Sequence, residues 1–144
     1  IKAEMPDEEQ SFAVNQLREA RIVVVDEAHG GIAMAKRAIT AYLESGGDKM
    51  NLANLPVVLH AVRGGLIFID QPRAAQLIEG CSEFIQKHML EAPQIPSEHL
   101  LDTLADALSS LEYYLEGGAV LRNEVRTNVL DLAAESVKAL GIAI

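Results

Sequence analysis

A run of helix-forming residues from Glu9 to Glu44 constrains the fold more than any other part of the sequence. Its apolar or small residues recur at intervals of three, four or seven, and charged residues such as Arg18 and Lys36 fall between them, as in an amphipathic helix. The positions of this stripe are Val14, Leu17, Val24, Ala28, Gly31, Ala35, Ala38 and Tyr42. The run ends at Ser45-Gly46-Gly47-Asp48, where glycine indicates a helix C-terminus. The sequence therefore predicts one long helix with a stripe that other helices must cover.

A glycine pair, Gly30-Gly31, lies in the middle of this predicted helix. Each glycine costs a helix about 1 kcal/mol relative to alanine. We therefore expect the pair either to bend the helix or to let another helix approach it closely.

Four shorter helices are predicted after the long one. Their ranges are about Asn51 to Phe68, Arg73 to Leu90, Ser97 to Glu116 and Leu121 to Leu140. Pro56 fits the first turn of its helix, Asp70 and Pro72 can start the next, and Ser97 is a good N-cap. Short connections between helices are typical of an all-α antiparallel four-helix bundle, here with an additional fifth helix.

The domain organisation follows from these ranges. Residues 1–8 are acidic and contain Pro6, so we expect a short N-terminal segment there and a single helical domain over residues 9–144. The chain opens at Ile1 without an initiator methionine, which indicates a piece of a longer polypeptide.

Charge and cysteine content restrict the partners and the compartment. A net charge of −9 disfavours nucleic acid and anionic membranes, and a protein partner fits better. The segment 52–69 is long and apolar enough to raise the question of a membrane span, but Arg63 near its middle argues against membrane insertion. The one cysteine, Cys81, cannot pair within the chain, which suits a reducing, cytoplasmic location. The four histidines show no metal-ligand spacing, so no metal is expected.

His60 lies in the most informative stretch, because its helix has two apolar faces. Leu55, Leu59, Val62, Leu66 and Ile69 form the stripe expected to face the core. A helical wheel places Val57, His60, Gly64 and Ile67 on the opposite side. Arg63 and the small Gly64 stand three and four residues after His60, which leaves the imidazole approachable.

Two interpretations of this second face follow from the residues. If another helix or domain covers it, His60 is a hydrogen-bonded core histidine. If it is open, His60 can act as a phosphoryl acceptor, because neutral imidazole is a nucleophile near its pKa and Arg63 can neutralise phosphoryl oxygens. Gly64 and Gly65 would then give a partner's active site access to the ring. An exposed apolar patch of this kind is also typical of a partner-binding site, with Val57 and Ile67 as its docking residues.

The stretch His60-Ala61-Val62-Arg63-Gly64-Gly65 resembles the histidine phosphotransfer signature, H-x-[hydrophobic]-K-G-[small]. That signature lies on the second helix of the five-helix domain that opens CheA-type chemotaxis kinases. Further blocks are similar to a module in the N-terminal half of ChpA/PilL-type hybrid kinases of twitching motility. These blocks are Val62-Arg63-Gly64-Gly65-Leu66, Pro72-Arg73-Ala74-Ala75, Leu101-Asp102-Thr103-Leu104-Ala105-Asp106-Ala107 and Glu112-Tyr113-Tyr114-Leu115-Glu116.

The resemblance implies a set of site residues. His60 would be the phosphoacceptor, and a carboxylate on the following helix would orient it, for which Glu79 and Glu83 are the nearest candidates. The chain departs from the family pattern at Arg63, where lysine is usual, and at Leu66 and Asp70, where a small residue and a glycine are usual. Several modules of this family keep the bundle while lacking the histidine.

The sequence therefore predicts a histidine phosphotransfer domain of a chemotaxis-type hybrid kinase that controls type IV pili. Such a domain is a phosphocarrier that exchanges phosphate with a kinase catalytic domain and with response-regulator receiver domains. It needs no cofactor of its own, because ATP and Mg²⁺ belong to the partner domains and no phosphate-cradling glycine loop follows a strand. The alternative is a non-phosphorylated module of the same system that binds another pilus-control protein. A plain structural spacer is a third interpretation.

Overall fold

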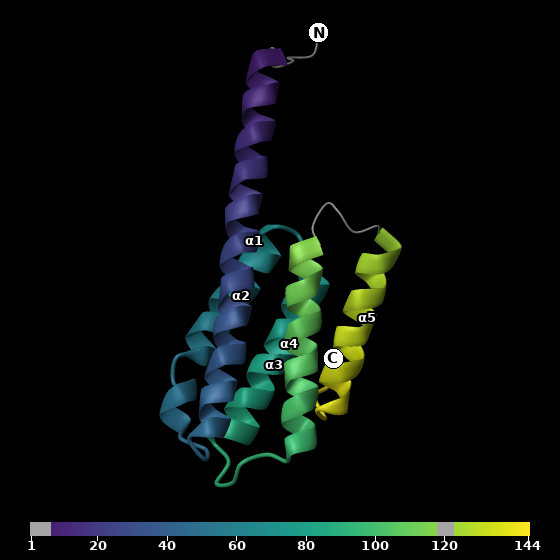
Figure 1. The fold of residues 1–144 in the computed structure, drawn as a ribbon. Coiled ribbons are helices and arrows are strands. Elements are labelled where there is room, and N and C mark those ends of the chain that lie inside the picture. Colours follow the sequence, from purple (N-terminus) through teal and green to yellow (C-terminus); the bar gives the residue numbers. More distant parts are fainter. Residues whose placement is uncertain (1–6, 118–122) are drawn as a thin grey trace.

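The computed structural model describes residues 7–117 and 123–144, and within these residues the chain is helical, without strands (Figure 1). The elements in chain order are α1 (Asp7–Glu44), the 3-10 helix η1 (Lys49–Leu52), α2 (Leu55–Phe68), α3 (Pro72–Ile85), the π-helical turn η2 (Gln86–Leu90), α4 (Glu98–Gly117) and α5 (Asn123–Ala139). The predicted all-α class is confirmed. Residues 1–6, which belong to the predicted N-terminal segment, and residues 118–122, which include the predicted start of the last helix at Leu121, lie outside the described part.

The core is one contiguous cluster to which all five α-helices contribute. Helix α1 packs against α2 and α4, and α3 packs against α2 and α4, so the contacts of these four helices form a closed ring. Helix α5 lies mainly against α4 and also against α3 (Figure 1). Its placement leaves the outer side of α2 without a covering helix.

Helix α1 is longer than the helices around it, and its first part projects beyond them (Figure 1). The predicted stripe is therefore covered only in its second half, where Ala28, Ala35 and Tyr42 are buried. Val14 and Leu17 are 52 % and 71 % exposed. Their prediction as covered positions is wrong, because no described element of the chain reaches that part of α1.

Helices α1 and α2 approach closely at the glycine pair. A Cβ atom placed on Gly31 would lie 2.5 Å from Cγ2 of Val62, a buried residue of α2. A Cβ atom on Gly30 would meet nothing within 4 Å. The close-approach prediction is confirmed for Gly31, since any side chain there would collide with the core stripe of α2.

The second predicted helix is in fact two elements. The 3-10 helix ends at Leu52, and α2 begins at Leu55 with Pro56 in its first turn. A proline lacks the N–H that a continuous helix would use at this point, so the chain breaks before it. Leu55, Leu59 and Val62 are buried together with Leu66, as the core stripe predicted.

Lys49–Phe68 is long and apolar enough, by length and composition alone, to cross a membrane. The core helix of a globular domain can pass the same test. Here the segment is interrupted between Leu52 and Leu55, and its buried residues pack into the helical core.

The ends of α3 also differ from the sequence prediction. Asp70 does not cap this helix, because it adopts a φ of +60° and the N-cap position falls on Gln71, which makes no side-chain capping bond. Pro72 starts α3, since proline is suited to a first helical turn. Regular α-helix ends at Ile85, and the chain continues to Leu90 as a π-helical turn.

The other helix ends follow the predicted signals. The Leu100 backbone N–H donates to Oγ of Ser97 over 3.3 Å, so Ser97 caps α4. Gly46 and Gly47 end α1 with φ of +74° and +100°, a region that glycine adopts readily.

Replacement of Gly31 by alanine is expected to destabilise the fold, whereas the same change at Gly30 is expected to stabilise it. The methyl group at position 31 must displace Val62, a stiff β-branched side chain, and such overpacking costs about 1–3 kcal/mol. At position 30 only the gain in helix propensity of about 1 kcal/mol applies. Urea denaturation of both variants measures the difference, and equal effects of the two changes would contradict the close approach.

Cys81 is expected to resist alkylation in the folded chain. Its side chain is fully buried, and this burial raises the pKa of the thiol from 9.0 to about 12. At a pH between these two pKa values the thiol of the unfolded chain is ionised and the buried thiol stays protonated. The free energy of unfolding therefore falls as the pH rises from 9.0 to about 12.

Iodoacetamide labelling followed by mass spectrometry tests this accessibility. The native chain should stay unlabelled at mildly alkaline pH, and the urea-unfolded chain should label fully. Labelling of the native chain at the unfolded rate would show that the core around α3 opens readily.

Candidate functional site

The side of α2 that faces away from the core is largely apolar and exposed. Val57 is 74 % exposed, Ile67 51 % and Phe68 73 %. His60 and Gly64 lie exposed between them. Because the core stripe of the same helix turns inward, this second face has to point outward, as the helical wheel indicates. We call these five residues the α2 outer face.

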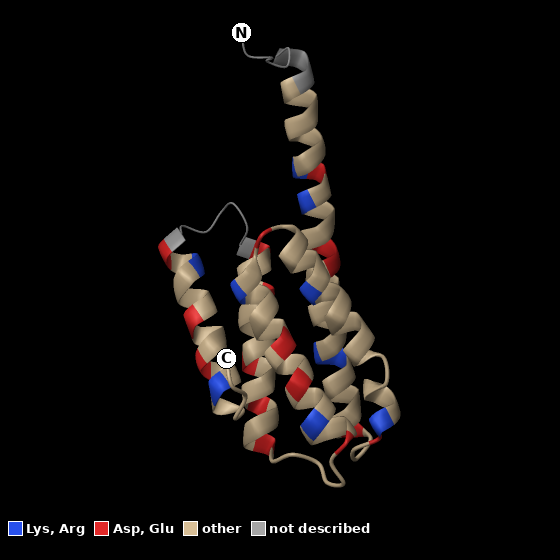
Figure 2. Ribbon diagram, turned by 180° about the vertical axis from the view of Figure 1, so that it is seen from behind, with Lys and Arg blue, Asp and Glu red and all other residues tan. Residues whose placement is uncertain are grey.

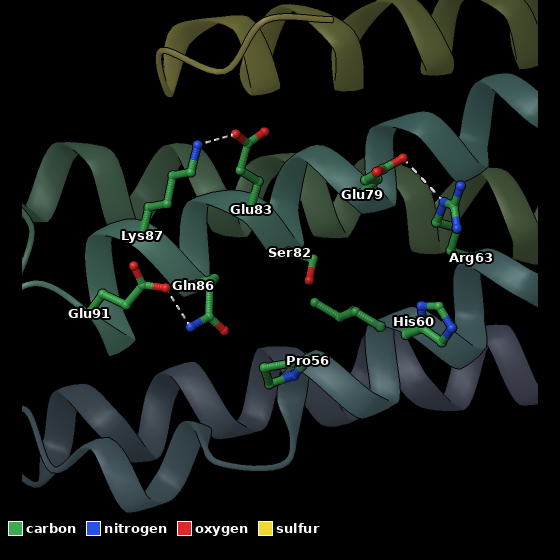
Figure 3. Close-up of a pocket in the computed structure, with 10 residues that line it drawn as sticks. Pro56, His60, Arg63, Glu79, Ser82, Glu83, Gln86, Lys87 and Glu91 are labelled. Carbon is green, nitrogen blue, oxygen red and sulfur yellow. Dashed lines mark hydrogen bonds and ion pairs between the residues drawn. The ribbon is translucent and has the colours of Figure 1, made fainter.

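A hollow of about 480 Å³ lies beside His60, between α2 and α3 (Figure 3). Helix α2 contributes Pro56, His60 and Arg63 to its wall. The opposite wall is formed by Glu79, Ser82, Glu83, Gln86, Lys87 and Glu91. The hollow therefore brings the predicted histidine, the predicted arginine and both candidate carboxylates into one place.

Each of the two carboxylates pairs with a cation in the structure. Glu79 pairs with Arg63, with 3.2 Å between its Oε2 and the arginine Nε. Glu83 pairs with Lys87 over 2.6 Å, one helical turn away on the α3–η2 segment. The hydrogen bond and the charge of Glu83 raise the pKa of Lys87. Figure 3 shows both pairs directed away from the ring of His60.

The two glycines after His60 have different surroundings. A Cβ atom on Gly64 would meet nothing within 4 Å, so this position is an open dip in the surface. A Cβ atom on Gly65 would lie 3.1 Å from Cγ1 of Val24 on α1. Gly65 therefore serves the packing of α2 against α1, and only Gly64 leaves space for an approaching molecule.

An apolar groove of about 510 Å³ runs along the other side of α2, where it meets α1. Its wall includes Val57 and Val58 from α2 and Val24 and Met34 from α1. Gly30 forms part of the floor. The groove is continuous with the α2 outer face through Val57, so the exposed apolar surface spans two helices.

Two polar side-chain pairs join α1 to α4, and the sequence analysis did not predict them. Lys36 Nζ lies 2.9 Å from Oε1 of Glu112, and His29 Nε2 lies 3.0 Å from Oε1 of Glu116. The spacing does place each pair on one helix face: His29 and Lys36 are seven residues apart on α1, and the two glutamates are four residues apart on α4. Opposite charges on two facing helices are recognisable only once the pairing of those helices is known.

The described residues contain no metal site. Acidic and basic residues are interspersed along the helices (Figure 2). Over the described ranges, no group of three or more histidine, cysteine, aspartate or glutamate side chains is arranged to hold a metal ion.

Comparison with known proteins identifies relatives of this sequence. The model of the FimL C-terminal domain family matches residues 15–137. The chain is 64 % identical over 142 residues to a protein of Pseudomonas aeruginosa (strain PAO1) named Scaffold protein FimL. The match covers 99 % of this chain and 25 % of the relative, so the chain spans about a quarter of the length of that protein. No solved structure matches the chain.

These matches correct the functional prediction. The relative is named a scaffold protein, and the matching family is that of FimL rather than of histidine kinases. The prediction of a histidine phosphotransfer domain with His60 as acceptor is therefore wrong. An interaction module without phosphotransfer, which the sequence left as the alternative, agrees better with these relatives.

The Arg63–Glu79 pair is expected to contribute little to stability, because both side chains are substantially exposed. Exposed ion pairs are usually worth about 0.2–1 kcal/mol and weaken as salt is added. A double-mutant cycle of Arg63→Gln and Glu79→Gln, followed by urea denaturation at low and high salt, measures the coupling. A coupling of several kcal/mol that salt does not change would show a rigid polar centre beside His60.

Proposed function

Because the chain belongs to the FimL C-terminal domain family, we propose that it is a protein-interaction module of a pilus-related scaffold. The α2 outer face is its docking surface, with Val57 and Ile67 as docking residues. The partner is another pilus-control protein, and the domain works in the cytoplasm without a cofactor of its own. Neither nucleic acid nor membrane insertion enters this function.

Exposure of the α2 outer face is the observation that carries the proposal. Val57, Ile67 and Phe68 lose contact with water only if another molecule covers them, and burial of one such side chain contributes about 1.5–3 kcal/mol. Contiguous exposed apolar residues on a folded domain are typical of protein-binding sites. An anionic chain with this apolar surface suits a protein partner better than a polyanion.

The shape of the surface suits a helix or a loop with an apolar side. Gly64 leaves a dip in the middle of the α2 outer face, and Gly30 leaves another on the α1 side of the adjoining groove. Positions without a Cβ atom let a partner backbone approach closely, as they do where helices pack on each other. His60 within this face and Arg63 beside it line the hollow between α2 and α3 and supply polar contacts.

The assignment to pilus control is supported by two separate observations on the sequence. The relative is named a FimL scaffold protein, and four sequence blocks resemble a module of twitching-motility hybrid kinases. We also propose that the fold is the antiparallel four-helix bundle with a fifth helix of the phosphotransfer type. The closed ring of contacts among α1, α2, α3 and α4, with α5 outside it, supports that arrangement.

Photo-crosslinking tests the docking surface in cells that express the full-length protein. A benzoylphenylalanine at position 57 should form an adduct with a second protein, whose identity mass spectrometry gives. The matched control is position 132, because Leu132 is an exposed apolar residue on α5. The control should yield no such adduct, since α5 lies away from α2.

The variant Ile67→Glu should abolish the adduct at position 57 without unfolding the domain. A charge cannot enter an apolar interface cheaply, whereas a half-exposed position tolerates it in the free chain. Circular dichroism checks the fold. Equal adducts at both positions, or an adduct only with another segment of the same polypeptide, would refute docking of a partner on the α2 outer face.

A further inference from the structure

The face of α1 that packs into the core carries arginines instead of apolar residues at the end of the bundle from which this helix projects. Counting back from Tyr42 in alternating steps of three and four gives Ile39, Ala35, Ile32, Ala28, Val25, Arg21 and Arg18. The first four of these, like Tyr42, are buried apolar residues of the core. The same face of the helix therefore turns from apolar side chains to two arginines within one turn.

These arginines line a cavity of about 520 Å³ that α1 shares with parts of the other helices. Ile69 and Gln71 enter it from the α2–α3 connection, and Tyr114 and Leu115 from α4. Arg126 enters it from α5. The size lies in the range of small-molecule pockets, roughly 300–1,000 Å³.

The charge in this cavity is opposite to that of the chain. Among the described residues, Arg18, Arg21 and Arg126 line the cavity together with one carboxylate, Asp26, whereas the whole chain carries a net charge of −9. Guanidinium groups bind carboxylate and phosphate oxygens through paired hydrogen bonds. Three of them around one hollow attract an anion.

Two of the guanidinium groups are held in place by neighbours within the protein. Nη1 of Arg21 donates to the backbone carbonyl of Ile69 over 3.0 Å. The guanidinium carbon of Arg126 lies 4.6 Å from the centre of the Tyr114 ring, a cation–π contact. The hydroxyl of Tyr114 in turn donates to Oε1 of Gln71. Cations oriented in this way lose little freedom when a ligand binds.

Arg126 also keeps a hydrogen-bond donor unused. Its Nε is shielded from solvent and has no acceptor among the residues that the structure describes. The guanidinium of Arg126 therefore has hydrogen-bonding capacity that its protein neighbours do not fully use.

The remaining wall of the cavity is apolar. Ile22, Val25, Ile69 and Leu115 supply it, so a fully hydrated inorganic ion would leave most of the surface uncovered. A ligand with an apolar or aromatic body and one anionic group matches both parts of the wall.

We propose that this cavity, which we call the arginine pocket, binds a small organic anion that has an apolar or aromatic body and a carboxylate or phosphate group. The proposal does not rest on the docking function of α2, because the arginine pocket lies at the end of the bundle and shares none of the five residues of the α2 outer face.

NMR titration of the isotope-labelled chain tests the arginine pocket with three probes of one shape. Phenyl phosphate and benzoate carry the two candidate anionic groups, and benzyl alcohol is the uncharged control. Both anions should shift backbone signals around Ile69, Gln71 and Leu115. Benzyl alcohol should bind at least about tenfold more weakly than either anion, because it cannot form the charge-assisted hydrogen bond. Tighter binding of one anion than of the other identifies the preferred head group.

Charge variants distinguish anion binding in the arginine pocket from nonspecific attraction of anions to surface arginines. Arg18→Gln should weaken both anions about tenfold, and so should Arg126→Gln. Asp26→Asn should strengthen them about two- to fivefold, because it removes the opposing charge. Arg37→Gln is the matched control, since Arg37 is an exposed arginine of the same helix outside the arginine pocket, and it should change nothing.

Three results would overturn the proposal. The first is equal binding of benzyl alcohol and the anions, and the second is an equal loss in Arg37→Gln and Arg18→Gln. The third is a set of shifts confined to the α2 outer face. If Arg126→Gln fails to fold, Arg18→Gln alone decides, because Arg18 is an exposed residue of α1 and its replacement is tolerated by the fold.

Discussion

The close packing of α1 on α2 at Gly31 and Val62 determines the arrangement of the exposed surface. Only a residue without a Cβ atom fits opposite Val62, so the two helices meet at this point with their backbones near each other. This contact fixes the rotation of α2 about its own axis: Leu55, Leu59 and Leu66 turn inward with Val62. The residues on the opposite side of the helix, the α2 outer face, then have to point outward.

The surroundings of His60 differ from those expected of a phosphotransfer site, in which a carboxylate orients the histidine. The two carboxylates nearest in sequence are engaged by Arg63 and Lys87, so they satisfy cations instead of positioning the ring. The same surroundings suit protein binding, in which a polar edge borders an apolar centre. The likeness of the His60 stretch to the phosphotransfer signature thus reflects a helix with an open, glycine-containing face, and that face is equally suited to docking.

Much of the helical content followed from the periodicity of the sequence, and the errors have local physical causes. Pro56 interrupts what looked like one helix from residue 51 to residue 68, since its ring excludes a backbone hydrogen bond. Asp70 has the chemistry of a cap but adopts a left-handed φ in the tight turn between α2 and α3, so Gln71 takes the N-cap position. Ser97 had the same chemistry and does cap its helix, because the long loop before α4 leaves it free to do so.

Sequence alone determined which residues of each helix share a face, because the repeat of 3.6 residues per turn is a local property of the backbone. It thereby placed Leu59 on the stripe expected to face the core and Val57 on the opposite face of the same helix. Tertiary structure decided which part of each face another helix covers: Leu17 belongs to the predicted stripe of α1 yet lies exposed beyond the bundle. It also brought Arg21 and Arg126 together from opposite ends of the chain. Such convergence depends on which helices pack side by side, and the spacing of residues within one helix carries no information about its neighbours.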